Sequence, residues 1–413
     1  MTKYCIIGNS AAAVGAVEAI RENDKKGQVT IISKEPYHVY SRPLISYLLA
    51  GKIGDEDMYY RDSHFYKDNG VEFINSTVLT IDTGERSVIM GDGKIEYDKL
   101  LIATGGIPFV PPTDGSEKEG VFTFTTWDDA KEISARLSDV KKAVVIGGGM
   151  IGIKSSEALQ ARGIEVTIVE LADSILSTVF DNIASTIAKE HLEMRGIRIL
   201  IGNSVSKIEG KGSVSGVTLT DGEKIDCDLV IFAIGVRPNV DVAKDTAIEI
   251  NRGIVVDEEM QTSVEGVFAA GDVAEAFDRL TGEKRPLPIW PLAYRQGKIA
   301  GSNMSGVKKE YDGGFVMNSI ELIDVPTISF GLTNIDEGLE VMSEQEGEEY
   351  KKVVLKDDRV VGAIFIGCID RAGILSGLIR DEVDVSTFKE ELIGDNFGYI
   401  SFPKELRKER LMR

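Results

Sequence analysis

The stretch VIGGGMIGIKSSEALQARGIEVTIVE, residues 145–170, decides the fold of this 413-residue chain. An apolar run before the glycines predicts a buried strand, and helix-forming residues follow them. Gly147, Gly149 and Gly152 have the spacing G-x-G-x-x-G. The first glycine permits a tight turn, the second lets the backbone approach a pyrophosphate, and the third allows close packing of helix on strand. This strand–turn–helix predicts dinucleotide binding, with a ligand-free glycine-rich turn as the alternative.

Glu170 supports a ligand at this turn. It ends the next predicted strand, EVTIVE (165–170), at about the distance after the glycines where an acid accepts hydrogen bonds from a ribose 2′-hydroxyl. A carboxylate at that position repels a 2′-phosphate. The sequence therefore favours NADH over NADPH.

A weaker copy of the motif, IIGNSAAAVGAVEAI (6–20), lies near the N-terminus. Gly8 keeps the first position, but Ser10 and Ala13 replace the second and third glycines. A serine hydroxyl can still donate to a phosphate, and alanine costs little packing. Glu35 follows the strand QVTIIS (28–33) where a ribose-binding acid belongs, and Asp272 ends an apolar strand, where it can bind a polyol chain such as ribityl.

The rest of the chain continues the alternation of predicted strands and helices. The first unit runs to YDKLLIATGG (97–106), and a linker rich in proline and glycine, FVPPTDGSEKEG (109–120), follows it. The second unit ends on CDLVIFAIGVRPN (227–239), and PIWPLAYRQGKIAGSNMSG (288–306) reads as a proline-capped helix start. From about Asp312 the strands are broken by acidic loops, which suggests a smaller α+β domain.

Composition excludes several classes of function. The formal net charge of −20 argues against binding nucleic acid or an anionic membrane. No apolar run approaches the ~20 residues that span a bilayer, and the N-terminus shows no signal peptide, so we expect a cytoplasmic protein. Cys5, Cys227 and Cys368 form no C-x-x-C pair and the three histidines show no common spacing, so no metal or iron–sulfur site is expected within the chain.

The order of these motifs resembles the flavoproteins with two dinucleotide-binding domains. That family includes NADH:rubredoxin reductases, ferredoxin reductases, coenzyme A disulfide reductases and NADH oxidases. The chain is most similar to the rubredoxin-reductase and NADH–nitrite-reductase branch, and to flavoprotein subunits such as that of phenylglyoxylate dehydrogenase. The motifs YSRPLIS (40–46), AIGVRPN (233–239) and GVFAAGDVA (266–274) extend the resemblance over about residues 1–310.

The resemblance implies an α/β fold with two Rossmann-like domains, the NAD domain inserted in the FAD domain, and a C-terminal α+β domain. The expected segments are 1–112 and 241–311 for FAD, 113–240 for NAD, and 312–413 for an interface or docking domain.

The resemblance also implies roles for residues on both units. The ADP part of FAD would be held by Gly8, Ser10, Ala13 and Glu35, and the flavin side lined by Arg42 and Pro43. Ala11, Thr104 and Gly105 are further candidates for cofactor binding. Asp272 would bind the ribityl chain, and the helix that starts at Pro291 would point its N-terminus at the flavin pyrimidine. The NAD site would comprise Gly147, Gly149, Ile151, Gly152, Glu170 and Gly235.

The sequence argues against thiol chemistry at the flavin. Coenzyme A disulfide reductases carry a redox-active cysteine just after the second strand of the FAD unit, but here EPYHVYSRPLISYLLAG (35–51) contains none. Many relatives also pair a lysine near Tyr47 with a glutamate near Lys154. This chain has lost that base and exchanged the acid for a base, so we hypothesise that Lys154 lies near the meeting point of flavin and nicotinamide. An exposed or helix-paired lysine is the alternative.

These inferences predict an FAD-dependent NADH:acceptor oxidoreductase. Hydride would pass between NADH and FAD, and single electrons would pass to or from an iron–sulfur carrier such as a rubredoxin or ferredoxin, or an iron–sulfur enzyme subunit. The basic tail KELRKERLMR (404–413) is a candidate docking site for an acidic partner, or a solvated helix end. An NADH oxidase or peroxidase and a non-enzymatic flavin-binding subunit are the alternatives, and homo- or hetero-oligomers are compatible with all of these.

Overall fold

The computed structural model describes residues 1–334 and 338–411, with side chains described up to residue 408. Its internal contacts divide the chain into two compact units. Unit 1 contains Met1–Phe109, Phe124–Ala135 and Gly235–Phe315. Unit 2 contains Val110–Thr123, Arg136–Ile234 and Val316–Arg413.

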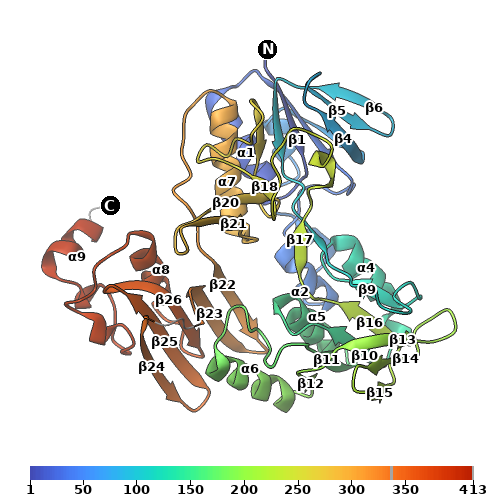
Figure 1. Ribbon diagram of the computed structural model, residues 1–413, viewed down its shortest axis with the longest axis vertical. Helices are drawn as coiled ribbons and strands as arrows, with labels where there is room; N and C mark the ends of the chain where they lie inside the picture. Colours follow the sequence, from blue (N-terminus) through green and yellow to red (C-terminus); the bar gives the residue numbers. More distant parts are fainter. Residues whose placement is uncertain (335–337, 412–413) are drawn as a thin grey trace. The chain divides into compact units, whose positions relative to one another are not determined.

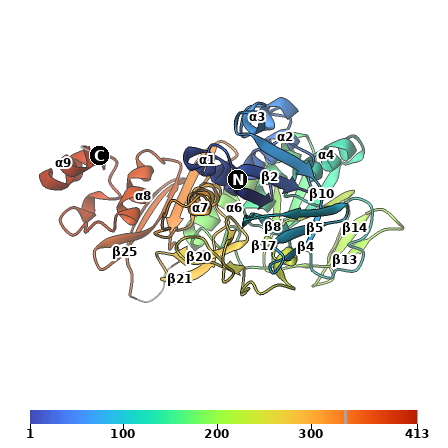
Figure 2. The ribbon, with the colours of Figure 1, turned by 90° about the horizontal axis from the view of Figure 1, so that it is seen from above.

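Unit 1 is built on a five-stranded parallel sheet with strand order β19-β7-β1-β2-β3. Strands β1, β2, β7 and β19 are mostly buried apolar runs, as expected for a parallel sheet covered by helices, whereas the edge strand β3 is partly exposed. Helices α1 (Ala11–Asn23) and α7 (Trp290–Met304) lie side by side (Figures 1 and 2). The strands are β1 (Lys3–Ile7), β2 (Gln28–Ser33), β3 (Val71–Asn75), β7 (Lys99–Ile102) and β19 (Val267–Ala269).

Unit 2 contains a second five-stranded parallel sheet, with strand order β12-β11-β10-β16-β9, in which β10, β11, β12 and β16 occupy the places of β1, β2, β3 and β7. The edge strands differ in chain order, because β9 precedes β10 whereas β19 follows β7. Helices α5 (Met150–Ala161) and α6 (Asn182–Met194) follow its strands β10 and β11 in the chain. The strands are β9 (Val121–Thr123), β10 (Lys142–Ile146), β11 (Glu165–Val169), β12 (Arg198–Leu200) and β16 (Leu229–Phe232). Two similar parallel sheets confirm the predicted pair of Rossmann-like cores.

Each parallel sheet is accompanied by a three-stranded antiparallel sheet at the same place in the chain order. In unit 1 this sheet consists of β4 (Val78–Asp82), β5 (Ser87–Met90) and β6 (Gly93–Glu96). In unit 2 it consists of β13 (Val205–Glu209), β14 (Gly216–Leu219) and β15 (Lys224–Ile225). The repeat seen in the sequence motifs therefore extends over the whole nucleotide-binding fold.

The C-terminal part of unit 2 forms a five-stranded antiparallel sheet of order β22-β23-β26-β25-β24, and α8 packs against β26 (Figure 1). This arrangement confirms the predicted α+β character. Its elements are β22 (Met317–Leu322), β23 (Val325–Gly331), β24 (Glu340–Glu346), β25 (Glu349–Lys356), β26 (Arg359–Ile366), α8 (Ala372–Arg380) and α9 (Lys404–Leu411).

The remaining elements are short and belong mainly to unit 1. Helix α4 begins at Trp127 and lies mostly in unit 1, although the sequence expectation put it within 113–240. The division into four segments stays a prediction. These elements are α2 (Ile45–Leu49), α3 (Phe65–Asp68), α4 (Trp127–Arg136), β8 (Gly106–Pro108), β17 (Val236–Pro238), β18 (Ile254–Val255), β20 (Ala274–Asp278) and β21 (Glu283–Pro286).

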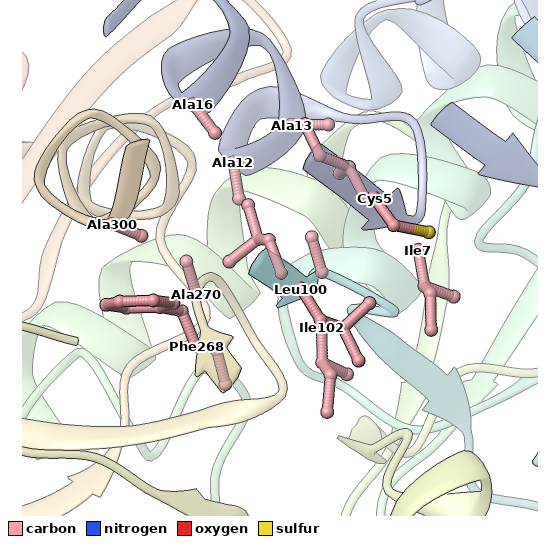
Figure 3. Packing of buried hydrophobic residues seen from close by; sticks show 14 of the residues in the cluster. Cys5, Ile7, Ala12, Ala13, Ala16, Leu100, Ile102, Phe268, Ala270 and Ala300 are labelled. Carbon is pink, nitrogen blue, oxygen red and sulfur yellow. The ribbon is translucent and has the colours of Figure 1, made fainter. Parts of the chain in front are cut away.

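Small residues let α1 and α7 approach closely. A Cβ added to Gly297 would lie 2.0 Å from the carbonyl oxygen of Ala12, and one added to Gly301 would lie 2.4 Å from that of Ala16. Ala12, Ala13 and Ala16 of α1 and Ala300 of α7 belong to the buried core of unit 1, together with Leu100 of β7 (Figure 3). Any larger residue at Gly297 would separate the helices.

Within the described residues, no helix is long and apolar enough to cross a membrane. The same part of the chain contains no group of three or more histidine, cysteine, aspartate or glutamate side chains arranged to hold a metal ion.

Candidate functional site

The two glycine turns have the same geometry. Gly8 and Gly147 both have φ of 110°, a conformation that disfavours any side chain. Their N–H groups donate to the carbonyls of Ile32 and Val169, each at 2.8 Å. A Cβ on Gly8 would lie 2.0 Å from the carbonyl oxygen of Ala103, so the first glycine of each motif is required by the backbone alone.

The second motif position opens toward space in front of a helix. Gly149 is the N-cap of α5, and a Cβ added there would meet no atom within 4 Å. Ser10 is the N-cap of α1, and its side chain makes no capping hydrogen bond. Both helix N-termini therefore fit a pyrophosphate, because unpaired backbone N–H groups and the helix dipole favour an anion. In unit 1 the Ser10 hydroxyl is also available to that anion.

The third position is set by packing. A Cβ on Gly152 would lie 1.9 Å from the carbonyl oxygen of Gly147, so the second motif requires glycine there. In the first motif Ala13 is fully buried at the corresponding place. Ala11 and Ile151 stand beside these positions in the first turns of α1 and α5.

The acid of the second unit is positioned by backbone groups. Glu170 directly follows β11 and accepts hydrogen bonds from the N–H of Gly148 at 2.5 Å and of Ala172 at 2.7 Å. The structure thus brings Glu170 to the glycine turn. Each carboxylate oxygen retains a lone pair for a ribose hydroxyl.

The acid of the first unit is positioned by side chains. Glu35 accepts hydrogen bonds from the hydroxyl of Tyr40 and from a guanidinium nitrogen of Arg42, each at 2.6 Å. Burial lowers the pKa of Arg42, but its interactions with Tyr40, Glu35 and Asp272 more than offset this and leave the pKa above its ordinary value. The resemblance implies that Arg42 lines the flavin side, and in the structure its guanidinium forms an ion pair with Glu35. Pro43 directly follows it in a short 3₁₀ turn.

Asp272 lies just beyond β19, at a glycine turn tied to α7. The N–H of Gly271 donates to the side-chain oxygen of Gln296 at 2.8 Å. Burial raises the pKa of Asp272 and Arg42 lowers it, with a net rise above the usual value. Within the described residues no lysine or arginine nitrogen lies within 4 Å of this carboxylate. A half-buried carboxylate of this kind fits the hydroxyls of a ribityl chain. Pro291 stands in the first turn of α7, as predicted for the helix start.

The two strand-end motifs ATGG and AIGVRPN are bonded to each other. The Thr104 hydroxyl donates to the carbonyl of Asn239 at 2.7 Å, and the N–H of Asn239 donates to the carbonyl of Gly105 at 2.9 Å. Strands β8 and β17 continue this pairing in antiparallel register. Gly235 (φ 97°) is the third residue of AIGVRPN, and its carbonyl accepts a hydrogen bond from the N–H of Phe109.

Lys154 has defined partners within unit 2. It forms an ion pair with Glu157, one turn further along α5, and donates to the carbonyl of Glu321 at 2.9 Å. Glu157 in turn accepts from the N–H of Ile323 at 3.0 Å. These bonds attach α5 to the end of β22 and to the turn that follows it. Tyr47 belongs to α2 of unit 1, where its ring lies 5.8 Å from the ammonium of Lys52. The proximity of Lys154 to the flavin stays a prediction.

Cys5 and Cys227 are unsuited to thiolate chemistry at the predicted flavin site. All three are free, and Cys5 and Cys227 are buried. Burial raises the pKa of each of these two thiols to about 12, so both stay protonated at neutral pH. Cys368 lies in the C-terminal part of unit 2 and is partly exposed.

Sequence reasoning missed the residues that surround Glu35. Tyr40 and the segment Thr125–Trp127 join Arg42 there, although some 85 residues separate the two segments. No local sequence pattern predicts contacts between segments so far apart in the chain. The apolar and aromatic character of YHVY (37–40) was the one signal that this loop is buried.

Two protein-family models match this chain. The model for pyridine nucleotide-disulphide oxidoreductases matches residues 2–297, and the model for the rubredoxin NAD⁺ reductase C-terminal domain matches residues 317–383. This chain belongs to the pyridine nucleotide-disulphide oxidoreductase family. It is accordingly an NAD(P)H oxidoreductase that uses FAD and a nicotinamide dinucleotide, as the resemblance implied.

Several curated relatives are similar over most of the chain. The epsilon subunit of NADH-dependent phenylglyoxylate dehydrogenase from Aromatoleum evansii is 31% identical, with 95% of each chain covered. A Bacillus subtilis nitrite reductase is 33% identical over 92% of this chain, which spans about half (47%) of that protein. An NADH oxidase from Methanocaldococcus jannaschii is 34% identical over 74% of this chain and 70% of its own length.

Solved structures show the same fold. A ferredoxin reductase from Rhodopseudomonas palustris is 27% identical with a TM-score of 0.83, covering 89% of this chain and 91% of its own. Putidaredoxin reductase, solved in a covalent complex with putidaredoxin, has a TM-score of 0.87 over 99% of this chain and 98% of its own. At 24% identity the second comparison concerns the fold alone.

Proposed function

We propose that this chain moves hydride between NADH and FAD and single electrons between FAD and an iron–sulfur protein or iron–sulfur subunit. The observation that carries the proposal is the pair of matching glycine turns, each with its own acid, in a protein without a thiol in the segment where disulfide reductases need one. FAD supplies the acceptance of two electrons and their release one at a time.

The chain's own residues bind and orient the two dinucleotides in this proposal. The N-termini of α1 and α5 hold the pyrophosphates, and Glu35 and Glu170 accept from the riboses. Asp272 holds the ribityl chain, and the N-terminus of α7 stabilises negative charge on the flavin pyrimidine. No side-chain acid or base is required, because hydride transfer depends on proximity and orientation.

The relatives support an iron–sulfur partner. A ferredoxin reductase and a subunit of NADH-dependent phenylglyoxylate dehydrogenase are among them, and residues 317–383 of this chain match the rubredoxin NAD⁺ reductase C-terminal domain. The same chemistry runs in either direction, so in a larger complex the protein would reduce NAD⁺. We also propose that it works in the cytoplasm, where NADH is available and its three free cysteines stay reduced.

A second candidate is an NADH oxidase, which the relative from Methanocaldococcus jannaschii favours. This reaction would pass electrons from reduced flavin to oxygen. It needs no cysteine in a slow, direct form. The two candidates share the NADH half-reaction and differ in the acceptor.

The test begins with the protein reconstituted with FAD under anaerobic conditions. Addition of NADH is expected to bleach the flavin absorbance within seconds, and a flavin that stays oxidised would mean a non-enzymatic flavin-binding protein. Oxygen uptake is then compared with reduction of a purified rubredoxin and a ferredoxin. Faster turnover with oxygen than with either iron–sulfur protein would favour the oxidase.

A further inference from the structure

The acids near the end of the second strand are oriented by different means in the two repeats; Glu170 directly follows β11, whereas Glu35 lies two residues beyond the last residue of β2. Glu170 receives one backbone N–H on each carboxylate oxygen. Glu35 also receives one donor on each oxygen, but both donors are side chains: Arg42 on Oε1 and Tyr40 on Oε2. Orientation of the first acid therefore depends on residues that can be replaced.

The hydroxyl of Tyr40 has a fixed direction. Tyr40 is 3% exposed, and its oxygen accepts a hydrogen bond from the backbone N–H of Trp127 at 3.2 Å. Because an N–H can only donate, the single proton of the hydroxyl is left for Glu35. The buried indole ring of Trp127 packs on Tyr40, with ring centroids 5.3 Å apart. The tyrosine thus transmits the position of Trp127 to the carboxylate.

Arg42 makes a second, parallel link. One guanidinium nitrogen donates to Glu35 at 2.6 Å and another donates to the carbonyl of Thr125 at 3.0 Å. The guanidinium carbon also lies 5.1 Å from the centre of the Tyr40 ring, within cation–π range. A planar fork is needed for this geometry, since one ammonium group cannot occupy both positions.

We propose that Tyr40 and Arg42 are positioning residues that hold Glu35 for the ribose hydroxyls of the adenylate half of FAD. They anchor Glu35 to the segment Thr125–Trp127, which lies outside the N-terminal repeat in sequence. Each carboxylate oxygen has used one lone pair, so one acceptor position per oxygen remains for two neighbouring hydroxyls. This inference rests on the proposed FAD site and adds the residues that determine its selectivity for the adenylate.

The experiment compares flavin binding by the apoprotein, using the change in flavin fluorescence during titration. Tyr40→Phe is expected to weaken FAD binding about tenfold, the usual effect of losing one hydrogen bond to a charged group. FMN lacks the adenylate, so its dissociation constant should be unchanged. Tyr4→Phe is the matched control, because Tyr4 is also buried in unit 1 and donates to a carboxylate, that of Asp24, at 3.0 Å.

Two further variants keep the inference falsifiable. Arg42→Lys retains the positive charge but cannot donate to both Glu35 and Thr125 as the planar guanidinium does. This variant should also weaken the binding of FAD but not the binding of FMN. Adding Tyr40→Phe to Glu35→Gln should cost little beyond the single Glu35→Gln change, because both act through one carboxylate. Unchanged FAD affinity in Tyr40→Phe, or equal losses for FAD and FMN, would overturn the inference. Failure of the unmodified protein to bind FAD at all would instead overturn the proposed function.

Discussion

Lys154 shows how one residue can be identified from sequence while its surroundings are not. The sequence marks it as a base where relatives carry an acid, and the structure gives it two partners, Glu157 and the carbonyl of Glu321. Both partners belong to the same unit. Its position near the flavin stays a prediction, which the rate of flavin reduction by NADH can test.

Replacement of Lys154 by methionine tests that prediction. Loss of one positive charge near the flavin should slow its reduction by NADH about tenfold, which corresponds to ~1.4 kcal/mol of transition-state stabilisation. The NADH dissociation constant should hardly change. Anaerobic stopped-flow measurements give both quantities. Lys189→Met, which removes a partly exposed lysine paired along α6, is the control, and identical rates in the two variants would mean that Lys154 is structural.

Glu170 is predicted to select NADH over NADPH in the proposed site. Glu170→Ser removes the charge that repels a 2′-phosphate, so kcat/KM for NADPH relative to NADH should rise at least about tenfold. NADH affinity should fall as well, because the N–H of Gly148 loses its acceptor. Steady-state dye reduction with each nucleotide measures the ratio. Glu165→Ser, at the exposed start of β11, should leave it unaltered.

At the scale of elements, the contact between α1 and α7 depends on glycine. Gly297→Ala would place a Cβ 2.0 Å from the carbonyl oxygen of Ala12, so the helices must separate. Overpacking of this kind costs about 1–3 kcal/mol. We expect a lower Tm and faster loss of FAD, whose predicted ligands lie at the starts of both helices. Gly373→Ala in α8 is the matched control, since its Cβ would meet no atom within 4 Å; an equal effect there would contradict the packing argument.

Helix α6 is joined to β25 by a buried ion pair. Asp181 accepts from Ala184 N–H at 2.9 Å, and from the Tyr350 hydroxyl and Lys352 ammonium at 2.8 Å each. Burial raises the pKa of Asp181, but the hydrogen bonds from Lys352 and the other donors lower the pKa by more than burial raises it. The pKa of Asp181 therefore lies below its usual value. Lys352 itself is 1% exposed, so removal of its partner leaves a buried charge.

This pair predicts a pH dependence of stability. A carboxyl with a lowered folded-state pKa stabilises the protein above its unfolded pKa of ~3.9, and this contribution is lost as the pH falls through the folded value. Asp181→Asn should therefore lower the Tm clearly at pH 7, with a difference that shrinks below about pH 4. Calorimetry from pH 7 to pH 3 measures it, with the exposed Asp139→Asn as control. A difference independent of pH would contradict this assignment.

At the scale of the whole molecule, the proposed electron carrier must dock on a protein whose formal net charge is −20. Many such carriers are acidic, so docking requires a local basic surface. Lys404 and Lys408 are exposed on α9, whereas the side chain of Arg410 and residue Arg413 lie outside the described residues. The basic tail stays a hypothesis for docking.

Removal of residues 404–413 tests the tail. If the tail docks the partner, reduction of a rubredoxin or ferredoxin should slow several-fold and lose part of its salt dependence, while NADH-dependent dye reduction stays the same. The two activities are measured on one preparation. Equal loss of both would show that the truncation damages the enzyme, and loss of neither would show that α9 is a solvated helix end.

The sequence by itself determined the two nucleotide turns, the acid that follows each of them, and the lack of a cysteine between Glu35 and Gly51. These features are local: strand periodicity, glycine spacing and residue identity act over a few residues, and the matching φ values of Gly8 and Gly147 confirm the turns. Only the tertiary structure decided what surrounds those residues. The bonds from Glu35 through Arg42 to Thr125 and the fit of Gly297 on Ala12 join segments far apart in the chain, where no local pattern fixes which side chains meet.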